Sequence, residues 1–596
     1  MDLSTKSQGD ALVEEAPAAI GMPVALPRRS RTAFLRSIFS EERFFLILSV
    51  FIGVFSGLSV VCFRFAIDWC RIYLLGSGYT LSTSRLLLAP TLAGLVIAVL
   101  VIHVFPLARG SGVNQTKAAL FIYNGYIPLR TAVGKFITAA LAIGSGHSLG
   151  PEDPSLQIGA SLASAIGRQL HLSRDRMRLI APVGAAAGLA AAFNAPISAV
   201  LFVIEEVIGR WTAGILGSVV LSAVSSVVVM RWFLGSESLF RIPPVELKQP
   251  SELIAYAVLG VVGGLASVVF SSGIATLRPR FKALPNWTQY FQPALAGLLI
   301  GLIAVLGAPQ VMGAGYEYID EAMHGQFTWQ FLAILAGLKI VATLLSFVSG
   351  TPGGMFAPTL FIGAMLGAAV GGAEHVLLPH LTGSPGTYAL VGMGVLFAGF
   401  LRVPMTSVFM VLEVSGNYSI IVPVIVANTF AYVISRKLQP TAIFDILTRQ
   451  DGLDLPSMEE QREEGILRVE DAMRPVTDPV LKAEETLEQA WQRANANAPE
   501  VPKVLLVQLS PTGWSSVTLE ELKTMIKEGK NTLTLASVLA GRQVPFLHPD
   551  HSLDTALRYV DRWPLVPVVS RADFRQLEGV ITQQDVLKRY RDFGEG

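Results

Sequence analysis

Charged side chains are scarce in this sequence, making up 15% of its 596 residues against 52% hydrophobic ones. The charges that are present crowd into the two ends of the chain. A long, charge-poor middle excludes a water-soluble globular protein there and is typical of a protein that crosses the membrane many times. Uncharged runs, each long enough to cross about 30 Å of hydrocarbon as a helix, occupy residues 44–63, 86–106, 212–230, 253–277, 287–316 and 414–435.

Cysteine is nearly absent as well. Cys62 and Cys70 are the only two, and on one predicted helix they lie too far apart to bridge each other, which excludes a disulfide framework. A cleavable signal pattern is missing from residues 1–40, which are polar, rich in Ala and Pro, and then basic just before the first apolar run. Under the positive-inside rule this N-terminal segment is expected to be cytoplasmic.

One stretch of the sequence occurs twice. Residues 145–167 read SGHSLGPEDPSLQIGASLASAIG, and residues 349–371 read SGTPGGMFAPTLFIGAMLGAAVG. The copies share their Ser-Gly start, a Gly, a Pro and an Ile-Gly-Ala run, but Glu152 of the first copy stands opposite Phe356 of the second. Glycine-rich, proline-interrupted apolar segments at corresponding places of two halves are the best sequence indication of a transporter's binding site.

The repeat extends in both directions. A Pro-x-Leu-Ala-Gly-Leu segment precedes both Gly110-Ser111-Gly112 and Gly313-Ala314-Gly315, and Glu205 has a counterpart in Glu413. Two similar halves are therefore expected at 40–235 and 250–437, within a membrane domain of residues 41–450. The uncharged stretch 340–373 is too long for one crossing, and its Ser-Gly-Thr-Pro-Gly-Gly sequence is expected to break it in the middle.

After residue 437 the hydropathy falls and a soluble region follows, which also contains a repeat. The sequence VTLEEL at 517–522 parallels ITQQDV at 581–586, and each follows an apolar stretch expected to be a buried strand, at 504–507 and 565–569. These units resemble CBS domains, at 466–541 and 543–594. In that family a Thr/Ser-x-x-Asp contacts the ribose of an adenine nucleotide, so the resemblance implies Thr582 and Asp585 as nucleotide-binding residues; a purely structural pair is the alternative.

Three segments are expected to begin helices whose N-terminal amides face one place: GSGV at 110–113, GPEDP at 150–154 and GMFAP at 354–358. Pro154 lies in a first helical turn, where its missing N–H costs nothing. Helix N-termini carry partial positive charge and free N–H donors, so three of them form an anion site without Arg or Lys. Such a site holds an ion loosely enough to release it, as conduction requires.

Glu152 is a carboxylate set among these donors. It competes with a permeant anion because it is itself an anion attached to the wall of the site. When it takes up a proton it loses its attraction to the donors, which couples proton occupancy to anion occupancy. Ionisable residues inside a membrane are costly and are functional by default, so the sequence indicates a proton-sensitive gate.

These motifs resemble the CLC family of chloride channels and chloride/proton antiporters, over residues 40–450 plus the tandem CBS tail. The resemblance implies an all-α polytopic membrane protein with a fold of inverted repeats and broken helices, followed by a soluble α+β tandem CBS module. It also implies a homodimer with one anion path per subunit. The anion-binding residues that it implies are Ser111, through its hydroxyl, and Gly110, Gly112, Phe356, Ala357 and Phe444.

The family's exchangers carry an internal glutamate that relays protons, at the second Glu of an Ile-Glu-Glu run, whereas its channels usually have a non-acidic residue there. This sequence reads Ile204-Glu205-Glu206, so the resemblance implies Glu206 as the proton relay and Glu152 as the external gate. Lys135, seventeen residues before Glu152, matches a buried basic position of the family. The alternative for Glu206 is a structural pair with Arg210, one helical turn on.

The sequence departs from the family pattern around the anion site. Asp153 replaces the usual Gly after the gating glutamate, and it either interacts with the neighbouring carboxyl or faces water. Asn114 replaces the Pro of the usual Ser-Gly-Ile-Pro. Phe444 replaces the tyrosine whose hydroxyl contacts the central anion, which leaves Ser111 as the only side-chain hydroxyl expected there and bears on anion selectivity.

The expected function is chloride transport, as a chloride/proton antiporter, with a passive voltage- or pH-gated chloride channel as the alternative. The sequence GHSLG at 146–150 also matches the G-x-S-x-G nucleophile elbow of hydrolases. That elbow requires a preceding strand, whereas a helical segment precedes it here, so an enzyme is not expected. The expected partners are chloride, protons, the lipids of the plasma (inner) membrane and a second copy of the chain. The CBS domains are expected to be cytoplasmic with an adenine nucleotide as their ligand, and no metal, other cofactor or nucleic acid is expected.

Overall fold

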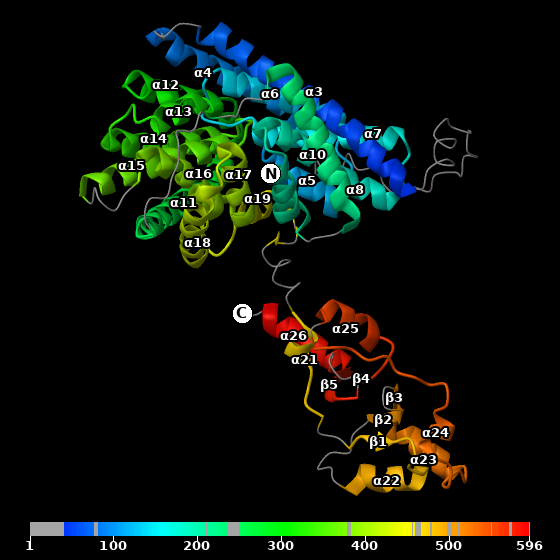
Figure 1. Cartoon of the computed structure of the whole chain (residues 1–596). Helices are drawn as coiled ribbons and strands as arrows, with labels where there is room; N and C mark the ends of the chain where they lie inside the picture. Colours follow the sequence, from blue (N-terminus) through cyan, green and yellow to red (C-terminus); the bar gives the residue numbers. More distant parts are fainter. Residues whose placement is uncertain are drawn as a thin grey trace. The chain divides into compact units, whose positions relative to one another are not determined.

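The computed structural model describes residues 41–76, 82–209, 213–235, 240, 250–377, 383–453, 455, 457–458, 467–476, 479–496, 504–510, 513–549, 551–570 and 575–594. The predicted N-terminal segment, residues 1–40, lies outside the described residues. The chain divides into two compact units, Met1–Met458 and Glu459–Gly596. Figure 1 shows that the first is helical and that the second contains both helices and strands.

The helices of the first unit form two sets in the same order. The first set is α3 (Glu41–Leu74), α4 (Thr83–Val99), α5 (Gly112–Phe121), α6 (Leu129–Gly144), α7 (Glu152–Gln169), α8 (Arg174–Phe193), α9 (Pro196–Phe202) and α10 (Ala213–Leu234). The second set is α11 (Glu252–Lys282), α12 (Gln292–Val305), α13 (Tyr316–Met323), α14 (Trp329–Val348), α15 (Phe356–Leu377), α16 (Pro385–Leu401), α17 (Pro404–Ser415) and α18 (Ile421–Leu438), and α19 (Ile443–Gln450) follows. Within the described residues, eight helical spans are long and apolar enough to cross a membrane.

The two sets pack in the same way, as the sequence repeat predicts. In the first half α7 packs on α8 and α3 on α10, while in the second half α15 packs on α16 and α11 on α18. Glycines allow the close approach, because a Cβ on Gly159 would lie 2.2 Å from the carbonyl oxygen of Gly184, and one on Gly363 would lie 2.3 Å from that of Gly392. The halves join where α4 packs on α12 and α9 on α17.

Two of the predicted crossings are interrupted in the structure. The run 287–316 contains α12, which has only 14 residues and at 1.5 Å per residue spans only about 21 Å. The run 414–435 starts in α17 and resumes in α18 after a left-handed turn at Gly416 (φ 61°). Neither interruption contains a charged residue, so the hydropathy of the sequence does not indicate it. The predicted break in 340–373 is confirmed, since α14 ends at Val348 and α15 begins at Phe356.

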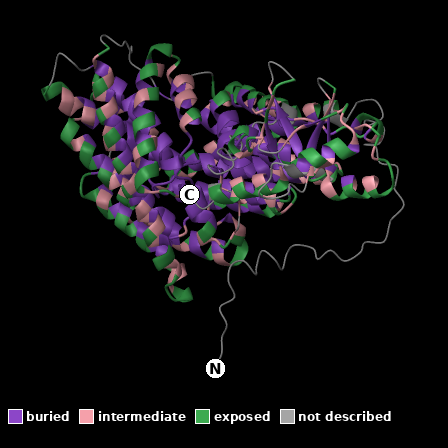
Figure 2. Ribbon diagram, turned by 90° about the horizontal axis from the view of Figure 1, so that it is seen from below, coloured by how far each residue is buried: buried purple, intermediate pink, exposed green. Residues whose placement is uncertain are grey.

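Buried residues fill the interior, and exposed residues lie on the outer turns of the helices (Figure 2). Large apolar side chains are common among the exposed ones, including Phe51, Phe55 and Trp69 on α3. An apolar exterior around a buried helical interior is what a lipid environment requires, because each helix satisfies its own backbone polar groups. This confirms that the first unit is a membrane unit.

The second unit contains two small sheets. β1 (Leu481–Lys482) pairs in parallel with β2 (Val504–Ser510), which pairs antiparallel with β3 (Gly513–Thr518), with Leu506 opposite Ser516. β4 (Val566–Val569) pairs antiparallel with β5 (Leu577–Ile581). β2 and β4 confirm the strands predicted from the sequence. The helices are α21 (Val469–Ala472), α22 (Leu487–Ala496), α23 (Leu519–Lys527), α24 (Leu535–Val538), α25 (Leu553–Val560) and α26 (Gln583–Gly594).

Candidate functional site

The two copies of the repeated segment cross each other inside the membrane unit. The amide of Gly150 donates to the carbonyl of Gly354 (2.8 Å), and the amide of Gly354 donates to the carbonyl of Gly150 (2.9 Å). Directly after this crossing α7 begins at Glu152 and α15 at Phe356, while α5 begins at Gly112. The three predicted helix starts are therefore confirmed, and the contacts of their first residues bring them together.

A buried lysine holds the loop before each crossing. Lys135 of α6 donates from Nζ to two carbonyls, including that of Gly110 (2.6 Å), and Lys339 of α14 donates to two carbonyls, including that of Gly313 (2.8 Å). Both lysines are completely buried. For Lys135 this agrees with the predicted buried basic position. Lys339 was not predicted, although it stands seventeen residues before Phe356, as Lys135 stands before Glu152.

Glu152 is the first residue of α7 and is completely buried. Its carboxylate accepts a hydrogen bond from the hydroxyl of Tyr316, at the start of α13, and another from the amide of Ala357 (3.3 Å), in the first turn of α15. The carboxylate thus takes a donor that the N-terminus of α15 would offer to an anion. Tyr316 was not predicted, although it directly follows Gly313-Ala314-Gly315, the counterpart of the GSG turn.

Asp153 is buried, with 3% of its surface exposed, so the alternative in which it faces water is wrong. Its carboxylate accepts hydrogen bonds from the amides of Gly112 (3.0 Å) and Val113 (3.0 Å) and from the hydroxyl of Ser111 (3.2 Å). These groups are the first donors of α5. Two consecutive residues of α7 therefore place their carboxylates on two different helix N-termini, Glu152 on α15 and Asp153 on α5.

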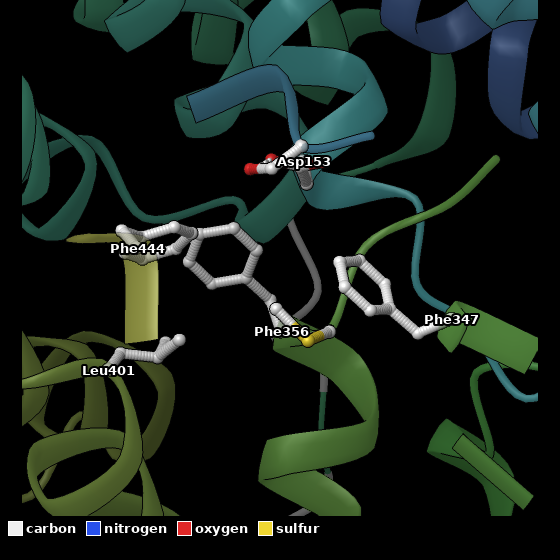
Figure 3. A pocket seen from close by; sticks show the side chains of 7 residues that line it. Asp153, Phe347, Phe356, Leu401 and Phe444 are labelled. Atoms are coloured by element: carbon white, nitrogen blue, oxygen red, sulfur yellow. Dashed lines mark hydrogen bonds between the residues drawn. The ribbon is translucent and has the colours of Figure 1, made fainter. Parts of the chain in front are cut away.

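A pocket lies beside Asp153, and in Figure 3 the carboxylate stands above the rings of Phe356 and Phe444. The ring centroids of Phe356 and Phe444 are 6.3 Å apart. Three of the residues predicted to bind the anion, Ser111, Phe356 and Phe444, therefore lie around one space, in which Ser111 and Asp153 are the only polar lining residues. The lining residues are Ser111, Asp153, Phe347, Met355, Phe356, Leu401 and Phe444.

The other residues predicted to bind the anion contribute backbone groups. The carbonyl of Gly110 binds Lys135, the amide of Gly112 binds Asp153, and the amide of Ala357 binds Glu152. A side chain outside the prediction ties Phe444 to this region, since the amide group of Asn114 donates to the Phe444 carbonyl (3.1 Å). Asn114 stands where the family pattern has proline, so this substitution supplies a donor that proline lacks.

Glu206 lies in a short π-helix, Val203–Ile208, and is buried. Its carboxylate pairs with the ammonium group of Lys117 on α5 (2.9 Å), and the same ammonium group lies 3.4 Å from the carboxylate of Asp445. Arg210, the partner that the structural alternative proposes, lies outside the described residues. Lys117 was not predicted. It is a charged residue in an apolar helix, and that scarcity was the available signal.

Glu205, next to Glu206, binds the start of another helix. Its carboxylate accepts from the amides of Met405 (3.2 Å) and Thr406 (2.9 Å) and from the Thr406 hydroxyl (2.7 Å), which caps the N-terminus of α17. Glu413 does the same for α9, accepting from the amides of Ile197 (2.9 Å) and Ser198 (2.7 Å). Each half therefore caps a helix of the other.

The GHSLG sequence does not form a nucleophile elbow. Helix α6, and not a strand, precedes it. The hydroxyl of Ser148 bonds that of Thr343 (2.9 Å), and Nε2 of His147 lies 3.2 Å from the carbonyl of Pro90. The serine and the histidine therefore have separate structural partners in a packed bend.

In the second unit Thr582 and Asp585 bond to each other. The amide and hydroxyl of Thr582 donate to Asp585 (2.9 and 2.6 Å), and Arg474 pairs with the same carboxylate (2.9 Å). Thr518 and Glu521 form the same box at the start of α23, where Arg542 pairs with Glu521 (2.8 Å). Both copies therefore begin their helices with a capped, arginine-paired carboxylate.

Comparisons with known proteins agree with this geometry. The family described as "Voltage gated chloride channel" matches residues 93–436, and the CBS domain family matches residues 536–592. The H(+)/Cl(-) exchange transporter ClcA of Vibrio campbellii is 31% identical over 67% of this chain and 88% of its own length. A protein of Ralstonia nicotianae whose name includes "chloride channel protein ClcB-like" is 31% identical over 69% of this chain and 99% of its own length.

Solved structures share the fold. That of a slow cyanobacterial Cl-/H+ antiporter has a TM-score of 0.63 and 25% identity, and the match covers 68% of this chain and 98% of that one. A eukaryotic CLC transporter has a TM-score of 0.60 and 18% identity, covering 93% of this chain and 99% of that one, which shows likeness of fold. With the crossing repeats and the three helix starts, these matches establish that the chain belongs to the voltage gated chloride channel (CLC) family.

Proposed function

We propose that this protein exchanges chloride for protons across a membrane. The observation that carries the proposal is the position of two buried carboxylates next to one pocket. Glu152 adjoins the pocket through its neighbour Asp153, and Glu206 adjoins it through Lys117 and Asp445, the residue after Phe444. Buried proton acceptors connected to an anion site are what coupled transport of the two ions needs.

Chloride would bind at the N-termini of α5 and α15, where backbone amides and the Ser111 hydroxyl are the donors. Both sets of donors are taken by carboxylates in this structure, through Gly112 and Val113 on α5 and Ala357 on α15. Protonation of Glu152 removes the charge that holds it on Ala357 and frees that donor for an anion. Entry of a proton and entry of chloride are then two parts of one exchange.

Glu206 would pass protons between Glu152 and the side of the membrane at which the first unit ends. Its carboxylate pairs with the ammonium group of Lys117 at 2.9 Å. That ion pair also supports the second candidate function, a passive chloride channel, because a carboxylate that stays paired with Lys117 does not carry protons. The two functions differ only in whether protons move with chloride.

The inner membrane is the proposed location, with the CBS unit in the cytoplasm. α11 ends in Arg280 and Lys282, and α18 ends in Arg436 and Lys437, so basic residues gather where the chain leaves the membrane unit. We also propose a homodimer, as the resemblance to the family implies. An adenine nucleotide at Thr582 and Asp585 would compete with Arg474 for the carboxylate, and a thermal shift on adding ATP that Thr582→Ala abolishes would support it.

Reconstitution into liposomes tests the exchange. An outward chloride gradient should drive protons inward against their own gradient, measured with a pH-sensitive dye inside the vesicles. Chloride efflux without proton movement would favour the channel. Absence of chloride efflux in protein that remains dimeric in detergent would contradict both functions.

A further inference from the structure

The three hydrogen bonds at Asp153 are those that a small anion would make. Two backbone amides, of Gly112 and Val113, and one hydroxyl, of Ser111, all lie within 3.0–3.2 Å of its carboxylate oxygens. α5 has 10 residues, long enough to present a partial positive charge at its N-terminus. The carboxylate therefore holds the position in which this helix offers an anion the most favourable binding.

An anion and the Asp153 carboxylate exclude each other at this position. Both are negative, and both need the same donors. α5 and α7 also pack closely here, because a Cβ placed on Gly112 would come within 2.7 Å of the backbone oxygen of Asp153. The remaining walls of the pocket are the apolar side chains of Phe347, Met355, Phe356, Leu401 and Phe444, which offer no second set of donors.

Asp153 is not a cap of its own helix. It belongs to the first turn of α7, yet its side chain binds the N-terminus of α5 and borders the pocket (Figure 3). Glu205 and Glu413 also bind the N-terminus of another helix, but they do not border this pocket, and they occur in both halves. Asp153 has no such counterpart, since Ala357 stands at the equivalent position. A residue present in one half only, at the pocket, is placed to act on the ion.

We propose that Asp153 is a tethered competitor of the permeant anion: its carboxylate occupies the anion position at the N-terminus of α5, and an anion binds there only after that carboxylate leaves. The inference rests on the proposed anion transport and adds a second carboxylate to it. Glu152 covers the donor of α15 and Asp153 covers those of α5, so one movement of the first turn of α7 uncovers both.

Chloride titrations of the purified full-length protein test the proposal. Asp153→Ala removes the competing side chain, and Asp153→Asn keeps its size but removes its charge. Both variants should bind chloride about tenfold more tightly than the wild type, or more, which corresponds to about 1.4 kcal/mol. Asp451→Asn is the matched control, because Asp451 pairs with Arg278 and Lys282 away from the pocket, and it should bind chloride as the wild type does. Isothermal titration calorimetry measures all four proteins.

Equal affinities in the wild type and Asp153→Asn would overturn the proposal, and so would weaker binding in Asp153→Asn, which would mark Asp153 as a structural support of the site. If Asp153→Ala does not purify in a folded form, the chloride affinity of Asp153→Asn alone tests the proposal. If the wild type shows no measurable chloride binding and Asp153→Asn does bind chloride, the result supports the proposal. Liposome assays of the wild type run in parallel and separate this inference from the proposed function. If the wild type exchanges chloride for protons and Asp153→Asn binds chloride with unchanged affinity, only this inference is overturned. If Asp153→Asn binds chloride more tightly but the wild type moves no protons, only the exchange function is overturned.

Discussion

The two halves of the membrane unit have the same backbone but differ in which buried polar side chains they carry. Lys135 and Lys339 occupy equivalent positions, and each binds the carbonyls of a glycine-rich loop. Glu205 and Glu413 are also equivalent, and each caps a helix of the opposite half. Each of these shared residues binds backbone groups of a loop or a helix start, which indicates that they hold the glycine-rich loops and helix ends in place.

The polar residues found in one half only have a different set of contacts. Glu152, Asp153 and Glu206 stand opposite Phe356, Ala357 and Val414 in the second half. Glu152 and Asp153 occupy helix donors at the pocket, and Glu206 forms a buried ion pair behind it. The comparison teaches that the buried carboxylates at or near the pocket stand where the repeat is broken, and we propose that the transport chemistry resides at these positions.

The largest effect is expected at Glu152. Glu152→Gln should abolish chloride-driven proton uptake while chloride flux continues, because an amide cannot carry a proton and has no charge to hold it on Ala357. Proton and chloride fluxes in the same liposomes measure both. Coupled proton uptake that persists in this variant would contradict the gate assignment.

Glu206 also lacks a counterpart in the second half, so its substitution is a further test of the comparison. Glu206→Gln should stop proton movement and permit chloride movement if Glu206 is the relay. If it serves only as a partner of Lys117, the variant should instead be less stable and keep its ratio of proton to chloride flux. Breaking a buried ion pair costs up to about 3–5 kcal/mol, and Asp445 remains near the ammonium group of Lys117 to reduce that loss. Thermal unfolding in detergent, measured beside the fluxes, separates these results.

Chloride affinity sharpens the comparison at the pocket. Phe444→Tyr should tighten chloride binding, because each hydrogen bond to a charged group contributes roughly 1.5–3 kcal/mol, and the phenyl ring of Phe444 lines the same pocket as the Ser111 hydroxyl. Ser111→Ala should weaken it by a similar amount. Calorimetry measures both, and no change in Phe444→Tyr beside a clear change in Ser111→Ala would show that the ring does not border the anion.

Glu205 and Glu413, the glutamates found in both halves, should respond alike to substitution. Glu205→Gln and Glu413→Gln should each lower the free energy of unfolding by about 1–2 kcal/mol, as expected for weakened helix caps, without changing the ratio of proton to chloride flux. Thermal unfolding midpoints and liposome fluxes measure the two properties. A change of the ratio in either variant would break the rule that symmetric polar residues are structural.

The smallest effect concerns Glu521 in the second unit. Burial alone would raise the pKa of this carboxyl, but the amide of Thr518 and the guanidinium of Arg542 lower it below its usual value of 4.5. Its contribution to stability is therefore present at neutral pH and is lost as the pH falls from about 4.5 through the lowered pKa. Glu521→Gln should lower the unfolding temperature of this unit more at pH 7 than at pH 3. An equal loss at both pH values would show that the carboxylate charge does not contribute.

Much of the order of helices could be predicted from the sequence, because the repeated segments indicate that the two halves share one backbone arrangement. Glycines and prolines fix where helices start, so the starts of α5, α7 and α15 followed from the motifs. The burial of Lys135 followed from the resemblance to the family, which has a buried basic residue at this position. In the second unit, alternation of apolar strands and a capped helix start gave β2, β4 and the beginnings of α23 and α26.

Side-chain partners far apart in the sequence could not be predicted in this way. Whether Asp153 turns to water or to α5 depends on the relative placement of α5 and α7, which no local pattern encodes. The contact of Tyr316 with Glu152 and that of Lys117 with Glu206 depend on the same packing. The interruptions of the apolar runs 287–316 and 414–435 were not predicted, because a short 3₁₀ turn and a left-handed glycine change the chain direction without changing its hydropathy.

The central claim, that the one-sided carboxylates couple protons to chloride, is tested most directly by the reversal potential of the reconstituted protein. With opposed chloride and proton gradients, the wild type should reverse at a potential set by both ions, and Glu152→Gln should reverse at the potential of chloride alone. A wild type that already reverses at the chloride potential would contradict the claim and identify the protein as a passive channel.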